Sequence, residues 1–129
     1  MTPGVPTRWR HLVHDQLDTA AERVARAEGH GAEGEGTRAM QELYPAVVTL
    51  ATIHVWLDDP PWESDVAPDE MHRRVQNRLP NLFAALTELD VQHVLTRPWA
   101  ARDAVPYLEE ARTFLDGTRT RVDRWIEGG

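Results

Sequence analysis

The sequence predicts an all-α fold: a four-helix antiparallel (up-down) bundle, either complete in one chain or completed by dimerisation. Apolar residues recur at spacings of three and four along four long segments, and no segment alternates as a strand does. Proline and glycine separate these segments by short connections, which favour antiparallel neighbours. A chain of 129 residues has the length of one domain, so residues 1–129 are predicted to form a single helical-bundle domain.

The first predicted helix covers about residues 7–28. One apolar stripe at helical spacing supports it: Val13, Leu17, Ala20 and Val24. The segment "GHGAEGEG" at 29–36 follows, and four of its eight residues are glycine. Because glycine disfavours helical backbone, we expect a flexible loop here that ends the helix and carries no site.

The second predicted helix covers about residues 37–57, with Thr37 as its N-cap. Apolar residues occupy three of its faces, so it should be buried on most sides. It is therefore either the central helix of the bundle or a helix whose extra face contacts a second subunit, which predicts a homodimer. Pro45 should kink this helix or mark its true first turn.

The third predicted helix covers about residues 68–95, with Pro68 in its first turn and a bend at Pro80. The fourth covers about residues 101–126. Its apolar row has one polar member, Thr118; the others are Ala104, Leu108, Ala111, Leu115, Val122 and Trp125.

Composition excludes several kinds of function. The chain has no cysteine, and all 14 basic residues are arginine, which we interpret as the coding bias of a GC-rich bacterial genome. Thiolate metal sites, cysteine nucleophiles and Schiff-base lysines are therefore excluded. A net charge of −7 argues against nucleic acid as a partner. With no signal peptide and no apolar run long enough for a membrane span, we expect a cytoplasmic protein without a membrane contact.

Histidines supply the main candidate site. In an up-down bundle His14, His54 and His72 share one end, and histidines on facing helices can line a polar pocket, with Asp58 or Glu70 as an anionic partner. The sequence has no Glu-x-x-His pair of the kind that dimetal bundles use, so we assign no metal, no cofactor and no catalytic residue.

His54 continues the apolar stripe of the second helix, so its ring should face the interior. A buried imidazole should be neutral and hydrogen-bonded to a carbonyl, a hydroxyl or another histidine. We therefore interpret His54 first as a structural residue and only second as part of a binding site.

Five tryptophans fall near predicted helix ends or in loops, where they should seal the ends of the bundle. Trp62 differs, because prolines and acids flank it in "DDPPWESD"; such a residue can anchor a partner or cover a pocket. The candidate ligand-binding residues are His14, His54, Trp56, His72 and Trp62.

The stretch "RWRHLVH" resembles a known signature: Arg8 precedes His14 at the spacing of the Arg–His pair of HEPN ribonucleases. That family forms small dimeric helical bundles that cut RNA with this pair. The motif there lies in a late helix and has a polar residue where this chain has Trp9, and the resemblance covers seven residues. We therefore do not assign the chain to the family and expect no nuclease activity.

Two functions remain from the sequence. The first is a non-enzymatic interaction or accessory module, a homodimer or a partner of another protein. The second is a bundle that binds a small-molecule ligand or a metal in a histidine-lined pocket, with catalysis as an open addition. Joint burial of His14, His54 and His72 would favour the second function, and scattered exposure the first.

Overall fold

The computed structural model describes residues 6–63, 65–87 and 91–128, and within them the chain forms six helices and no strand. The helices are α1 (Thr7–Ala32), α2 (Gly36–Asp58), α3 (Pro68–Asn77), α4 (Asn81–Thr87), α5 (Val91–Thr96) and α6 (Ala101–Gly128). The all-α prediction is thus confirmed. In the described part of the chain, no helix is both long enough and apolar enough to cross a bilayer.

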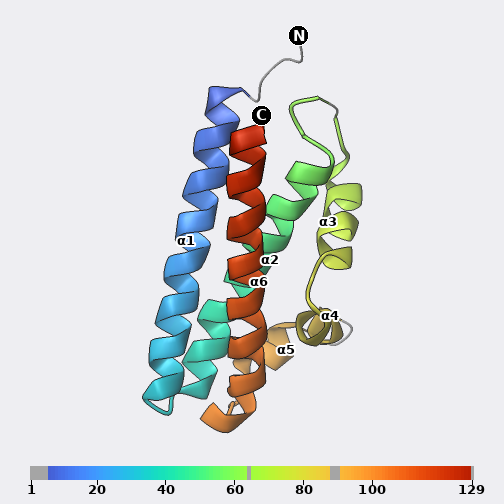
Figure 1. Cartoon of the computed structure of the whole chain (residues 1–129). Coiled ribbons are helices and arrows are strands. Elements are labelled where there is room, and N and C mark those ends of the chain that lie inside the picture. The colour runs from blue at the N-terminus through green and yellow to red at the C-terminus, as the bar shows by residue number, and fades with distance from the viewer. Residues whose placement is uncertain (1–5, 64, 88–90, 129) are drawn as a thin grey trace.

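Three long helices, α1, α2 and α6, pack against one another, and the short helices α3 and α5 pack on α2 (Figure 1). The chain runs along α1, returns along α2, reverses through α3, α4 and α5, and reverses again along α6. The start of α1, the end of α2, the start of α3 and the end of α6 therefore lie at one end of the molecule, which we call the closed end.

The core lies between the three long helices. The stripe predicted for α1 is buried throughout, and Ala27 extends it. All three apolar faces of α2 contribute buried side chains, among them Met40, Ala46 and Ile53, each fully buried. Among the described residues, Val105 of α6 is the large apolar side chain that remains exposed, at 45%. Helices of the same chain therefore cover the faces of α2 that suggested a second subunit.

The prediction of one continuous helix over about residues 68–95 is wrong. It is divided into α3, α4 and α5. The first break lies at Pro80, which has no N–H to continue the helix and whose ring disfavours helical backbone at Leu79. The carbonyl of Pro80 instead accepts a hydrogen bond from the amide of Ala84 (2.8 Å), which starts the next turn. Residues 88–90 of the third predicted helix lie outside the described residues.

The segment 29–36 also differs from the prediction, because α1 continues through two of its glycines to Ala32. Gly31 is a site of close packing: a β-carbon there would lie 2.9 Å from Cδ1 of Leu108 in α6. The chain reverses instead at Gly34, whose φ of 81° is a left-handed conformation that glycine adopts freely. Tertiary contact with α6 thus outweighs the weak helix propensity of glycine.

The predicted start of α2 also needs correction. Glu35, not Thr37, is the N-cap, and no side chain caps this end. The hydroxyl oxygen of Thr37 accepts a hydrogen bond from the amide of Trp99 (2.9 Å), which fixes the start of α6 against α2. Pro45 lies inside α2 and is not its first turn, because the helix begins nine residues earlier at Gly36.

Candidate functional site

A chain of polar side chains joins α2, α3 and α6 near the closed end. Nε2 of His54 lies 2.8 Å from the hydroxyl oxygen of Thr118. Nη1 of Arg121 donates to Nδ1 of His54 (2.9 Å), and Nη2 of Arg121 donates to the carboxylate of Asp58. The second oxygen of Asp58 pairs with Arg78, the C-cap residue of α3. We call these five residues the polar network.

These contacts determine where the protons of His54 lie. A guanidinium can only donate, so Nδ1 of His54 must accept and the imidazole proton must lie on Nε2. Nε2–H then donates to Thr118, whose own hydroxyl donates to the carbonyl of Phe114 (2.7 Å). Both ring nitrogens are therefore satisfied in the neutral imidazole, and a protonated ring would place an N–H against Arg121.

Electrostatics agree with this arrangement. Burial, the largest cause, together with the positive charges of Arg121 and Arg78, lowers the pKa of His54 from 6.5 to about 4. We predicted that His54 is neutral and hydrogen-bonded to a carbonyl, a hydroxyl or another histidine; the structure shows the hydroxyl of Thr118 as the partner. The ring is nevertheless only partly buried and lines a surface hollow.

Helical periodicity explains why these groups meet. His54 and Asp58 are four residues apart on α2, and Phe114, Thr118 and Arg121 are four and three apart on α6, so each set shares a face. The ring of Phe114 stacks on His54, with centroids 5.2 Å apart and planes inclined by 18°.

A hollow of about 480 Å³ opens beside this stack, and we call it the α6 hollow. Its lining comes from one residue of α2 and seven of α6: His54, Thr113, Phe114, Gly117, Thr118, Thr120, Arg121 and Arg124. None of these described lining residues is acidic. Two arginines thus stand at a partly apolar surface of a protein whose net charge is −7.

The two arginines differ in their partners. Arg121 is held by His54 and Asp58, as described above. Arg124 makes no hydrogen bond or ion pair with any other residue in the described ranges. Its guanidinium is therefore a cation of this hollow that no described residue neutralises.

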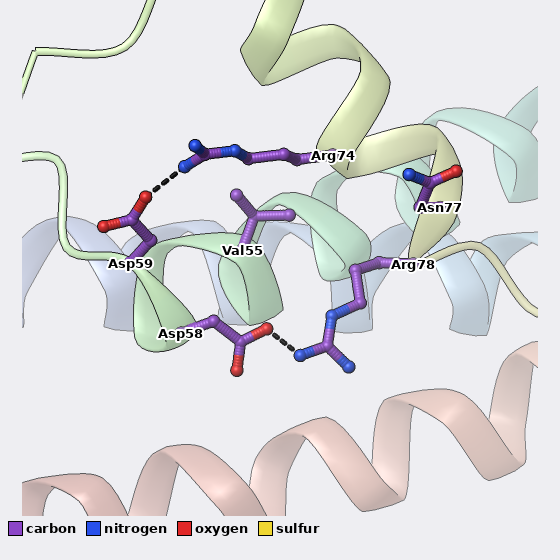
Figure 2. Close-up of a pocket in the computed structure, with 6 residues that line it drawn as sticks. All are labelled: Val55, Asp58, Asp59, Arg74, Asn77 and Arg78. Atoms are coloured by element: carbon purple, nitrogen blue, oxygen red, sulfur yellow. Dashed lines mark hydrogen bonds and ion pairs between the residues drawn. The ribbon is translucent and has the colours of Figure 1, made fainter.

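A second hollow, of about 460 Å³, lies between the end of α2 and α3. Figure 2 shows two ion pairs that cross it side by side, Arg74 with Asp59 and Arg78 with Asp58, with Val55 between them. Each of these arginines already has a carboxylate partner, so this hollow offers no unneutralised charge to a ligand. The two ion pairs hold α3 against α2.

Four tryptophans cover the closed end. The ring of Trp9 lies 5.6 Å from that of Trp56 and 5.2 Å from that of Trp62, and Trp62 lies 6.0 Å from Trp125. All four are partly buried. Trp56 and Trp62, both candidate ligand-binding residues, thus belong to an aromatic cluster that seals the bundle and do not line the α6 hollow.

The structure separates the three candidate histidines. His14 and His72 are exposed, and neither is among the residues that line the hollow of His54. Arg8 and His14 of the ribonuclease-like stretch are both exposed on α1. A spacing of six residues places them roughly 120° apart around the helix, so they do not share a face.

The turn between α1 and α2 brings another histidine near two acids. Nδ1 of His30 lies 3.1 Å from Oε2 of Glu35, and one ligand atom each from His30, Glu33 and Glu35 lie within 4.8 Å of one another. Exposed acidic groups often lie this close without an ion. Since the His30–Glu35 contact already pairs two of these groups, we assign no metal site here.

Sequence reasoning did not identify Phe114, Gly117, Arg121 or Arg124. One signal was available: Gly117 interrupts the long helical pattern of "ARTFLDGTRTRVDRW", next to the polar row member Thr118. Comparison of the chain with protein-family models, curated proteins and solved structures gives no match.

Proposed function

We propose that this protein is a small helical binding protein that takes an organic anion in the α6 hollow. The observation that carries the proposal is the guanidinium of Arg124, which no described residue neutralises, in a hollow that Phe114 also lines and whose described lining contains no acid. An apolar wall next to a cation favours a ligand with an apolar body and one negative group.

The neighbouring network prepares the site for an anion. Asp58 is shared by Arg78 and Arg121, so one carboxylate balances two guanidinium groups. Because His54 and Asp58 hold Arg121 in place, little side-chain entropy is lost when an anion contacts it.

Binding is proposed here without catalysis. Nδ1 of His54 accepts a hydrogen bond from Arg121, and Nε2–H of His54 donates one to Thr118. Neither ring nitrogen is therefore free to exchange a proton with a ligand. The pKa of about 4 also keeps His54 neutral at physiological pH. We keep the bacterial cytoplasm as the proposed setting, on the sequence alone.

The interaction module and homodimer that the sequence suggested have less support. Their basis was an apolar surplus on α2, and helices of the same chain cover that surplus. The tryptophans that were the other candidate contact pack on one another. A homodimer stays a prediction, and we identify no surface for it among the described residues.

The proposal can be tested by NMR titration of the ¹⁵N-labelled protein with benzoate, cyclohexanecarboxylate and, as a cationic control, benzylammonium. Either acid should shift the amide signals of Gly117, Thr118 and Arg121, and benzylammonium should not. Arg124→Gln should weaken binding of the acids severalfold. Arg119→Gln, an exposed arginine of the same helix outside the hollow, is the matched control. No shift with either acid at millimolar concentration would contradict the proposal, and so would equal losses in the two variants.

A further inference from the structure

We propose that the α6 hollow selects a flat aromatic acid, and that Gly117 is the residue that admits the aromatic ring. This inference rests on the proposed function, since it names the chemical class of the anion. It starts from the fact that Gly31, Gly34 and Gly36 have a visible structural reason and Gly117 has none.

Gly31 and Gly36 allow close packing, because a β-carbon would lie 2.9 Å from Leu108 and 2.5 Å from the carbonyl oxygen of Trp99, respectively. Gly34 has a positive φ. At Gly117 an added β-carbon would meet nothing within 4 Å in the described structure, and no left-handed φ requires glycine there. Gly29 is equally open, but it lies in the last turn of α1, whereas Gly117 lies in the interior of the 28-residue α6.

Glycine in the interior of a helix is less favourable than alanine, so neither packing nor local conformation explains this choice. What the missing side chain does provide is space: Gly117 lines the α6 hollow with bare backbone. A ligand can approach that backbone to ordinary carbon contact distance, about 3.5–4 Å, which a side chain would prevent.

The surroundings of Gly117 favour a flat ring. The stacked rings of Phe114 and His54 form the adjoining wall. Side chains of a helix lean toward its N-terminus, so Arg121 and Arg124, four and seven residues further along, lean back toward Gly117. Guanidinium groups are planar and stack on aromatic faces as well as pairing with carboxylates.

The geometry therefore assigns the two ends of the ligand. The ring would lie over Gly117 against Phe114, and the carboxylate would point along α6 toward Arg124. A saturated ring of the same size and charge is thicker and has no π face for the arginines, so it should fit less well.

The experiment compares benzoate with cyclohexanecarboxylate, using dissociation constants from NMR titration of the full chain. Benzoate should bind at least about fivefold more tightly. Gly117→Ala should raise the melting temperature by a few degrees, because alanine favours the helix, and should weaken benzoate at least about fivefold. Gly29→Ala is the matched control: it should also leave the fold intact and should not change the affinity for benzoate.

The outcomes separate this inference from the proposed function. If both acids bind equally well and Gly117→Ala leaves both affinities unchanged, the selection of a flat ring is wrong and the anion site stands. If neither acid binds, both proposals are wrong. A preference for benzoate that survives Gly117→Ala, or an equal loss of affinity in Gly29→Ala, would overturn the role of Gly117.

Discussion

Arg121 donates a hydrogen bond to Nδ1 of His54 across the contact between α6 and α2, at 2.9 Å. An arginine that donates to an imidazole keeps that imidazole neutral, because protonation would replace the accepting lone pair with an N–H. The contact therefore makes the stability of the protein depend on pH.

The first prediction concerns that dependence. The pKa of His54 is about 4 in the folded protein and near 6.5 in the unfolded chain, so between these values the unfolded state binds more protons. This contribution leaves stability unchanged above pH 6.5, lowers it as the pH falls toward 4, and levels off below 4. The shift corresponds to about 3 kcal/mol at most, which solvent screening of a partly exposed ring reduces to about 1 kcal/mol.

His54→Gln isolates this effect. The glutamine amide can accept from Arg121 and donate to Thr118, but it does not titrate. Urea unfolding at several pH values should show a shallower loss of unfolding free energy in the variant than in the natural protein between pH 6.5 and 4. Parallel curves would show that His54 is already solvated enough to titrate normally.

The second prediction concerns Asp58, which pairs with Arg78 and Arg121 at once. Asp58→Asn should lower the unfolding free energy by about 1 kcal/mol, the sum expected for two partly exposed ion pairs. The difference should shrink in 1 M salt, where the screening length is about 3 Å. Asp103→Asn, which alters a widely exposed pair with Arg102, should have little effect. Urea unfolding at both salt concentrations measures this, and equal losses in the two variants would count against the network.

The third prediction compares two tryptophans. Nε1 of Trp99 donates to the carbonyl of Val94 (2.9 Å) in a buried position, whereas Nε1 of Trp9 is buried and finds no partner in the described part of the chain. Trp99→Phe should therefore cost about 1–3 kcal/mol, because a buried carbonyl loses its donor. Trp9→Phe should change stability by less than about 1 kcal/mol, because an unsatisfied donor leaves together with some apolar area. Thermal or urea unfolding measures both, and a larger loss for Trp9→Phe would contradict the reasoning.

The fourth prediction concerns Gly36. A β-carbon there would lie 2.5 Å from the carbonyl oxygen of Trp99 and 2.7 Å from the backbone of Ala100, so the start of α6 would have to move. Gly36→Ala should lower the unfolding free energy by more than about 2 kcal/mol, in the range of severe steric changes. Circular dichroism melting should show a much lower midpoint than for Gly29→Ala, which meets no neighbour.

The fifth prediction concerns RNA. Arg8 and His14 lie in the first helix of a chain whose net charge is −7, and both the early placement of the motif and the charge argue against RNA cleavage. Incubation with single-stranded RNA should give no cleavage above a buffer control. Cleavage that disappears in both Arg8→Ala and His14→Ala would show that the resemblance to HEPN ribonucleases is functional.

The sequence predicted that His54 has a hydrogen-bond partner, and it left a carbonyl, a hydroxyl and another histidine open as that partner. His54 and Thr118 are the polar members of two apolar rows, and a partly buried imidazole needs a partner. The sequence was not sufficient to predict Arg121 as a partner, because the contact spans 67 residues and depends on how α6 is rotated against α2. Each residue turns a helix by about 100°. Helical periodicity therefore predicts how far a side chain lies from the end of the bundle more reliably than the direction in which it points.

His14 and His72 illustrate the same limit. Antiparallel order places their helix turns near the closed end, together with the tryptophan cluster, as the sequence predicted. Both side chains are nevertheless exposed. A shared histidine pocket requires that all three helices turn their histidines toward one another. The antiparallel order of the helices predicts only that the three histidines lie near the same end of the bundle.

The break at Pro80 has a consequence for the dynamics of the chain. It leaves α3 with ten residues, fewer than the ~12–15 that an isolated helix needs to be stable in water, and with Val75 as its buried side chain. The helical state of α3 therefore depends on α2, through Val75 and the ion pairs of Arg74 and Arg78. Amide hydrogens of α3 should exchange with solvent before those of α1, α2 and α6, through a local opening that leaves the three-helix core folded.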